Sequence, residues 1–251
     1  MTLRDGGSMA YFPFYMDIAG KRGVILGGGR IAAGKIAALL PFLPQLVCIA
    51  PVICGEIERM AASCPEGPGG LRLIYRRAEE ADLEGAFFVI AATDSPETNA
   101  WVSDLCREKG VLINAVDDRK NCSFYFPALV QRGPVTVGIS TGGCSPAAAS
   151  WLRRKAERMV PEGMGEAVTR LGELREQVKK SVPEADVRAA LLKLLFAFCE
   201  EKDFLLKDGE LEEFLSFIDN PPAITDAFQA ENAGERAELA GHMCRGWGYC
   251  L

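Results

Sequence analysis

A glycine-rich stretch near the N-terminus, residues 23–32 (GVILGGGRIA), places the strongest constraint on what this chain can fold into. Three apolar residues, 24–26, lead into three glycines, and an alanine-rich run with helical spacing follows from Ile31 to Leu40. A strand, a glycine turn and a helix in this order are typical of the first unit of a dinucleotide-binding domain.

Each position of this turn has an expected task. Gly27 permits the tight turn, Gly29 lets a pyrophosphate approach the backbone, and Ala32 stands at the third position of the G-x-G-x-x-G/A pattern, where helix and strand pack closely. The N-terminus of the helix offers free N–H groups to the phosphates. A glycine turn that binds no ligand is the alternative.

The rest of the N-terminal half alternates between apolar runs and helical segments. The expected strands share a short, continuously apolar composition and cover residues 45–50, 71–75, 86–91 and 111–116. A helix is expected over 52–62, and Thr93-Asp94-Ser95-Pro96 begins another. This alternation predicts an α/β fold with a doubly wound, Rossmann-like parallel sheet. Ligands of such sheets lie beyond the carboxyl ends of the strands.

The end of the second expected strand lacks the acidic residue that binds ribose hydroxyls in many NAD sites. The chain has Ala50-Pro51-Val52 there, which leaves ribose recognition to backbone groups. No arginine stands there for a 2′-phosphate, so the sequence favours NAD over NADP.

The pattern changes after the fifth strand. Residues 123–131 and 135–140 are β-rich and joined by a turn, and so short a pair must extend the sheet or pair with another subunit. A second glycine loop, 141–144, precedes a helix that starts at Ser145-Pro146. From about residue 161 the pattern is helical and strand-poor, interrupted at Pro183 and at 221–222.

Composition excludes some classes of partner. The net charge of −6 gives no reason to expect nucleic acid or an anionic membrane, and no apolar run is long enough to span a bilayer. No secretory signal pattern opens the sequence, so we expect a cytoplasmic protein. The nine cysteines contain no C-x-x-C pair, and most are expected to be small core residues.

An oxidoreductase on this scaffold would need a proton acceptor. No tyrosine is followed by a lysine four residues later, and the single histidine is His242, so a carboxylate is the expected base. Asp117 and Asp118 follow a buried strand at the expected ligand edge and are the best candidates. Aspartates that merely cap a turn are the alternative.

Residues 141–146 can present backbone N–H groups to an anionic substrate, or form an ordinary loop with a helix cap. Basic residues lie near this loop and near Asp117 and Asp118 in sequence, which suits a polycarboxylate: Arg119, Lys120, Arg132, Arg153 and Arg154. Cys144 has no plausible histidine partner. His242, Cys244 and Cys250 have loose metal-ligand spacing without a fourth ligand, so we predict no metal site there.

Taken together, these segments resemble the precorrin-2 dehydrogenase family, the NAD-dependent part of siroheme synthase, some members of which are also sirohydrochlorin ferrochelatases. Five segments carry the resemblance, in the family's order and spacing: LGGGRIAAGK (26–35), AATD (91–94), NAVDD (114–118), SFYFPA (123–128) and STGGCSP (140–146). They cover about residues 10–160.

The resemblance implies site residues. The family's NAD site corresponds here to Gly27, Gly28, Gly29, Arg30 and Ile31, with Pro51, Val52, Thr93 and Asp94. Its catalytic aspartate corresponds to Asp117, whereas Asp118 falls on a more variable position. Thr141, with Gly142 and Gly143, is implied to line the tetrapyrrole pocket.

The resemblance also implies an organisation and an activity. We expect an NAD-binding domain over 1–116, a dimerisation segment over 117–150 and a helical domain over 151–251 that closes over substrate. The implied reaction is the NAD-dependent oxidation of precorrin-2 to sirohydrochlorin by a homodimer. Iron insertion, with Fe²⁺ as a second substrate, is an additional activity to test. A chelatase alone, or an NAD-binding redox sensor without turnover, are the alternatives.

Overall fold

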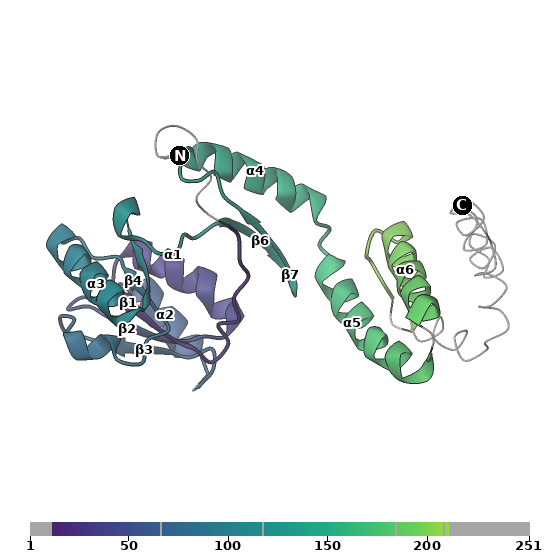
Figure 1. Cartoon of the computed structure of the whole chain (residues 1–251), viewed down its shortest axis with the longest axis horizontal. Coiled ribbons are helices and arrows are strands. Elements are labelled where there is room, and N and C mark those ends of the chain that lie inside the picture. The colour runs from purple at the N-terminus through teal and green to yellow at the C-terminus, as the bar shows by residue number, and fades with distance from the viewer. Residues whose placement is uncertain (1–11, 66, 117, 184, 208, 211–251) are drawn as a thin grey trace, which may run out of the picture. The chain divides into compact units, whose positions relative to one another are not determined.

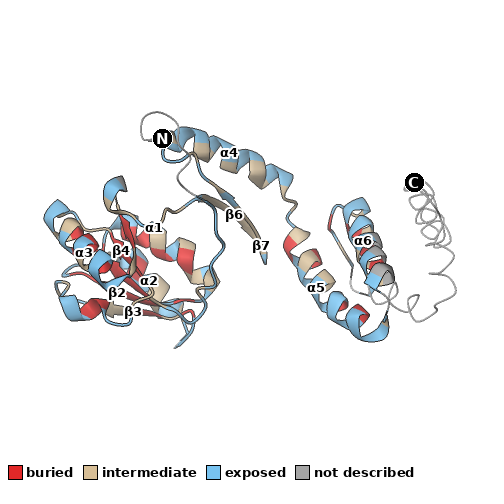
Figure 2. Cartoon of the chain, in the orientation of Figure 1, coloured by how far each residue is buried: buried red, intermediate tan, exposed pale blue. Residues whose placement is uncertain are grey.

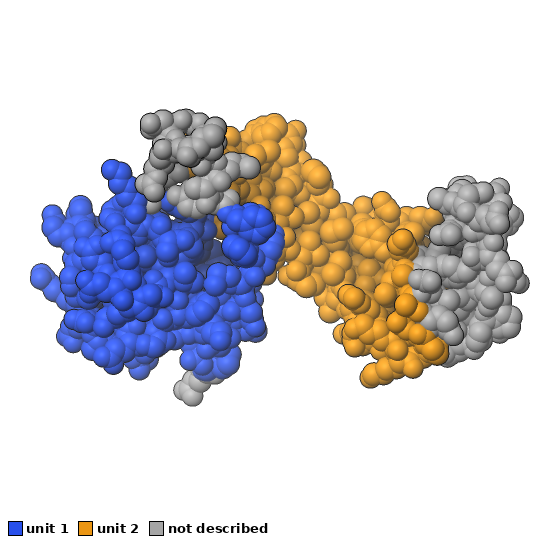
Figure 3. Space-filling model, viewed as in Figure 1, with its two compact units in different colours: residues 1–126 blue, residues 127–251 orange. Residues whose placement is uncertain are grey.

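The computed structural model describes residues 12–210 except 66, 117, 184 and 208. The chain divides into two compact units, residues 1–126 and 127–251, which are coloured separately in Figure 3. The three-segment organisation expected from the sequence stays a prediction.

The first unit contains a five-stranded sheet in which every neighbouring pair is parallel. Its strands are β1 (Arg22–Leu26), β2 (Gln45–Ile49), β3 (Leu71–Ile74), β4 (Phe88–Ala91) and β5 (Leu112–Ala115). Their order is β3-β2-β1-β4-β5 (Figure 1). The order reverses direction beside β1, which creates the switch point at which such sheets bind ligands. The predicted Rossmann-like sheet is confirmed.

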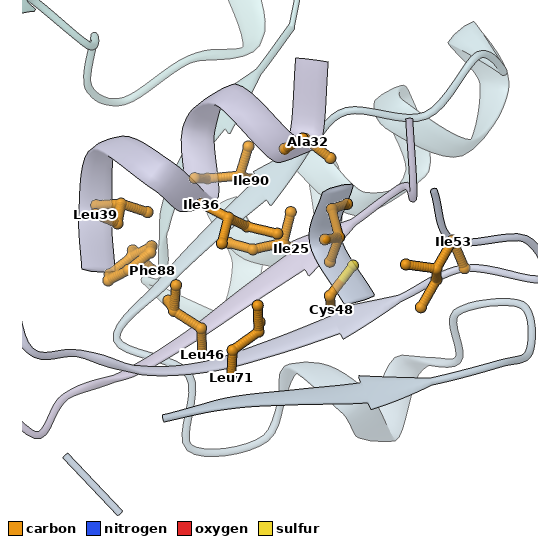
Figure 4. Packing of buried hydrophobic residues seen from close by; sticks show 13 residues of the cluster. Ile25, Ala32, Ile36, Leu39, Leu46, Cys48, Ile53, Leu71, Phe88 and Ile90 are labelled. Atoms are coloured by element: carbon orange, nitrogen blue, oxygen red, sulfur yellow. The ribbon is translucent and has the colours of Figure 1, made fainter. Parts of the chain in front are cut away.

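Helices cover both faces of this sheet, which explains why its strands are apolar throughout. The helices of the unit are α1 (Arg30–Leu39), α2 (Gly55–Ser63) and α3 (Pro96–Lys109), with short 3-10 turns η1 (Leu40–Phe42), η2 (Glu80–Leu83) and η3 (Arg119–Asn121). One core cluster joins α1 and α2 to the sheet through Ile25, Ile36 and Ile57 (Figure 4). A second joins α3 and η2 to the opposite face through Val102 and Leu83. The buried residues concentrate in the strands and on the inner sides of the helices (Figure 2).

Two elements begin more than two residues later than expected. The helix predicted from residue 52 starts at Gly55, because the Cys54 N–H donates to the Gly28 carbonyl at 2.8 Å and keeps 51–54 in a loop. The β-rich run predicted from residue 123 becomes a strand only at Ala128. Before it, the Ser123 N–H donates to the carbonyl of Ile113 at 2.8 Å, and the side-chain amide of Asn114 donates to the Phe124 carbonyl at 3.0 Å. These bonds hold the segment beside β5.

The second unit begins with an antiparallel hairpin, β6 (Ala128–Arg132) and β7 (Val135–Ile139). Its helices are α4 (Pro146–Met159), α5 (Met164–Ser181) and α6 (Ala185–Glu201). Both α4 and α5 pack on the hairpin, and α6 packs on α5. A Cβ atom at Gly165 would lie 2.5 Å from the Arg132 carbonyl carbon, so a glycine is needed where α5 meets the hairpin turn. The predicted interruption at residues 221–222 lies outside the described residues.

Among the described residues, no helix combines the length and the apolar character needed to cross a bilayer.

Candidate functional site

The first glycine of the turn after β1 is wedged between the ends of two neighbouring strands. Gly27 has φ +117, and its N–H donates to the Ile49 carbonyl at the end of β2 at 3.0 Å. A Cβ atom at this position would lie 2.2 Å from the Ala92 carbonyl oxygen, just after β4. Both the backbone conformation and the close approach therefore require glycine here.

The second and third glycines differ from each other. A Cβ atom at Gly28 would lie 2.1 Å from the Val52 carbonyl oxygen, so this glycine lets the loop after β2 approach. At Gly29 the backbone is extended, with φ −88 and ψ −172, and a Cβ atom would meet nothing within 4 Å. No packing within the protein explains the third glycine, whereas close approach of a phosphate group would.

The N-terminus of α1 also fits a phosphate. Ser95 caps α3 by accepting the Thr98 N–H, and Ser145 caps α4 by accepting the Ala148 N–H, each at 3.1 Å. The first residue before α1 is Gly29, which has no side chain to cap the helix. The N–H groups of its first turn are thus left for an external acceptor, and the helix dipole favours an anion there.

Exposed apolar side chains flank this turn. Ile31 is 52% exposed and Val52 is 80% exposed, although both lie at the switch point of the sheet. Pro51 and Arg30 are exposed as well. The predicted cofactor residues of the first two βα turns are therefore neighbours, and the set fits a dinucleotide: N–H groups for its phosphates and apolar surface for its rings.

Thr93 and Asp94 follow β4 at the same edge. The Thr93 hydroxyl is held by the side-chain oxygen of Asn99 at 2.8 Å, and the Asn99 amide donates back to the Thr93 carbonyl at 3.1 Å. Asn99 is 8% exposed and fixes the loop from within α3. The sequence reasoning missed Asn99, because a helical asparagine gives no signal of burial until the helix is placed.

The end of β5 carries the predicted catalytic position. Asp117 lies outside the described residues. Before it, the Val116 N–H donates to the Ala91 carbonyl at 2.9 Å, which fixes the end of β5 beside that of β4. After it, a side-chain oxygen of Asp118 accepts the Asn121 side-chain amide at 2.6 Å. Asp118 therefore stabilises the turn, as the alternative interpretation held for this residue.

The second glycine loop belongs to the second unit. Gly142 and Gly143 are exposed and have φ +59 and +72, so they form a turn that non-glycine residues disfavour. The Thr141 hydroxyl donates to the Ser145 carbonyl at 3.0 Å and is part of the turn that begins α4. Its contact with a tetrapyrrole stays a prediction.

The side chains that commonly bind metals do not form a candidate metal site in the described residues. Among the residues that the structure describes, no group of three or more His, Cys, Asp or Glu side chains is arranged to hold a metal ion. His242, Cys244 and Cys250 lie outside those residues.

Comparison with known proteins follows the same division of the chain. A family model described as "Putative NAD(P)-binding" matches residues 14–128, and one described as "Sirohaem biosynthesis protein central" matches residues 132–159. The chain thus combines an NAD(P)-binding domain of the Rossmann type with a central segment of siroheme biosynthesis proteins.

Several similar proteins are named siroheme synthase. The chain is 33% identical over 172 residues to a siroheme synthase of Pseudoalteromonas translucida, covering 68% of this chain and 35% of that protein. It is 32% identical over 216 residues to a siroheme synthase of Pseudomonas entomophila, covering 85% of this chain and 46% of that protein. The chain therefore spans less than half the length of these relatives.

A solved structure titled "SirC, precorrin-2 dehydrogenase" shares the fold. It has a TM-score of 0.65 at 23% identity and covers 84% of this chain and 100% of its own. Both family segments and the siroheme synthase relatives support the family that the motifs indicated, that of precorrin-2 dehydrogenase and the N-terminal part of siroheme synthase.

Proposed function

We propose that this protein oxidises precorrin-2 to sirohydrochlorin with NAD as the acceptor. The observation that carries the proposal is the glycine turn after β1: a Cβ atom at its third glycine would meet nothing within 4 Å, and this glycine precedes a helix without a side-chain cap, in a chain related to siroheme synthases. The reaction removes a hydride and a proton from the reduced macrocycle. Bound NAD accepts the hydride, and the protein aligns donor and acceptor.

The residues have separate tasks in this proposal. N–H groups around Gly29 bind the pyrophosphate, while Val52 and Ile31 cover the nucleotide. Thr93, held by Asn99, shapes the edge beside β4. Asp117 follows the end of β5 in sequence and takes the proton or orients the macrocycle.

The test is a spectral assay with precorrin-2 and NAD, in which sirohydrochlorin and NADH should form in equal amounts. Asp117→Ala should abolish turnover and leave the NAD dissociation constant unchanged. Asp118→Ala is the matched control, because its carboxylate bonds to Asn121, and it should retain turnover. A protein that binds NAD but forms no sirohydrochlorin would contradict the proposal and favour the redox-sensing module.

Iron insertion is a separate proposal. It would require removal of two pyrrole protons, and a carboxylate such as Asp117 could assist. Incubation of sirohydrochlorin with Fe²⁺ or Co²⁺ tests it, and a rate equal to that without protein would reject it.

The remaining parts of the proposal concern assembly and substrate contact. The hairpin β6–β7 has five-residue strands and is the proposed dimerisation element. The loop of Thr141, Gly142 and Gly143 is proposed to contact the tetrapyrrole. Light scattering tests the dimer, and Gly142→Val should raise the KM for precorrin-2 without changing NAD affinity.

A further inference from the structure

Lys35 is a cation in an unusual place. It projects from the middle of α1, five residues or about 7.5 Å along the helix from Arg30. Its side chain is half-buried, and its Nζ atom lies 3.9 Å from the centroid of the Phe126 ring. This is the shortest of the lysine–aromatic contacts in the described residues.

The ring that holds the ammonium group is itself fixed. Phe126 packs against Phe124 with a centroid distance of 5.7 Å, and Phe124 packs against Phe88 of β4 at 6.4 Å. Buried Asn114 of β5 donates to the Phe124 carbonyl at 3.0 Å. The cation therefore rests on a platform that is anchored to Phe88, the first residue of β4, and to Asn114 within β5.

The segment that carries Phe124 and Phe126 starts beside the carboxyl end of β5, at Cys122. Its sulfur donates to the carbonyl of Ala115, the last residue of β5, at 3.1 Å. Burial lowers the pKa of Lys35. Burial raises the pKa of the Cys122 thiol, so at neutral pH the thiol is uncharged and does not neutralise the ammonium group.

Other lysines at comparable exposure have carboxylate partners. Lys109 pairs with Glu80 at 3.0 Å, and Lys202 pairs with Glu210 at 3.5 Å. Among the described residues, no carboxylate forms an ion pair with Lys35. An aromatic ring attracts a cation without cancelling its charge. A partly desolvated ammonium group gains most from an anion that arrives and excludes water with it.

We propose that Lys35 is a substrate-positioning cation, which receives a carboxylate of the tetrapyrrole beside the Phe126 ring. This inference rests on the proposed function, because precorrin-2 and sirohydrochlorin carry many carboxylates. The pair forms only when the macrocycle binds, and it fixes the orientation of the macrocycle relative to the end of β5.

The experiment titrates the full chain, saturated with NAD, with sirohydrochlorin and follows the absorbance of the tetrapyrrole. Lys35→Met should weaken sirohydrochlorin binding about tenfold and raise the KM for precorrin-2 to match, with kcat little changed. Lys35→Arg should restore most of the affinity. Lys35→Gln serves the same comparison if the methionine variant does not fold.

Lys21→Met is the matched control. Lys21 also lies over a phenylalanine ring, that of Phe87, at 5.8 Å, but it precedes β1 and so lies at the amino edge of the sheet, away from the glycine turn. This variant should bind sirohydrochlorin as the wild type does.

Three results would overturn the inference. A folded Lys35→Met protein with unchanged sirohydrochlorin affinity would mean that the charge meets no substrate. Weaker NAD binding with unchanged sirohydrochlorin binding would assign the charge to the cofactor's phosphates. Loss of kcat alone would assign the charge to the chemical step and not to substrate binding. A wild type that binds NAD but no sirohydrochlorin would refute the proposed function as well, which separates the two failures.

Discussion

The prediction that most directly tests the site is Gly29→Ala. Alanine fits this position without moving the protein, because the backbone is extended and a Cβ atom would meet nothing within 4 Å. Alanine is a poorer N-cap than glycine, by about 0.5–1 kcal/mol. Loss of a glycine from the unfolded chain offsets this by about 0.4–1 kcal/mol. The free energy of unfolding should therefore change by less than about 1 kcal/mol.

Binding of NAD should respond far more strongly. The added methyl group would occupy the space against which we expect the pyrophosphate to lie, so the dissociation constant should rise at least about tenfold, or about 1.4 kcal/mol. At an NAD concentration about 100 times the wild-type dissociation constant, the ligand stabilises the wild type by about 2.7 kcal/mol and such a variant by about 1.4 kcal/mol. Calorimetric titration measures the affinity, and unfolding with and without NAD measures the stabilisation.

Two other glycines of the same segment supply controls. Gly34 is exposed within α1 and a Cβ atom there would meet nothing within 4 Å, so Gly34→Ala should stabilise the protein by about 1 kcal/mol and leave NAD affinity unchanged. Gly28→Ala would push against the Val52 carbonyl and strain the bond from Cys54, at a cost of about 2–4 kcal/mol. A folded Gly29→Ala protein with wild-type NAD affinity would refute the assignment of the pyrophosphate to this turn.

The remaining predictions concern buried polar groups and thiols. Asn99→Ala leaves the Thr93 loop without its partner and should cost about 2–3 kcal/mol in urea unfolding and weaken NAD binding, whereas an unchanged affinity would show that the loop does not need Asn99. Burial raises the pKa of Cys48 to about 12 and that of Cys106 to about 11, so neither thiol should react with a thiol reagent at neutral pH, while exposed Cys144 should; labelling followed by mass spectrometry checks this. Unfolding lets both buried thiols release protons near their ordinary pKa of 9.0, so stability should decline as pH rises above that value, and a flat profile in urea titrations between neutral and strongly alkaline pH would contradict it.

Regular features of the sequence predicted the sheet and its order of elements, because burial on both faces makes each strand a continuous apolar run. The same argument located the ligand edge, since the carboxyl ends of parallel strands meet there. It did not locate the start of α2. That boundary depends on one bond between Cys54 and Gly28, which are far apart in sequence and adjacent only in the folded unit.

Polar residues that act through tertiary contacts could not be predicted from the sequence. Lys35 lies inside the motif at 26–35, but the sequence gives no signal that it has a role, because a lysine on a helix is ordinarily solvated. Its significance depends on Phe126, which the chain brings to α1 only after β5 is complete. Asn99 was missed for the same reason: its partner Thr93 is close in sequence, but its burial depends on how α3 packs.

The three consecutive glycines show why a motif has to be interpreted position by position. From the sequence they suggest one task, the approach of a nucleotide. In the structure Gly27 and Gly28 are required for packing, because the absence of a side chain lets the segments that follow β4 and β2 lie against the turn. Gly29 alone has no structural demand on it and so carries the evidence for a ligand. Two glycines that pack the sheet would persist in a chain that had lost its cofactor, whereas the third would be free to change. The effect of Gly29→Ala on NAD binding, compared with that of Gly28→Ala on stability, therefore separates a working nucleotide site from a scaffold that only retains its shape.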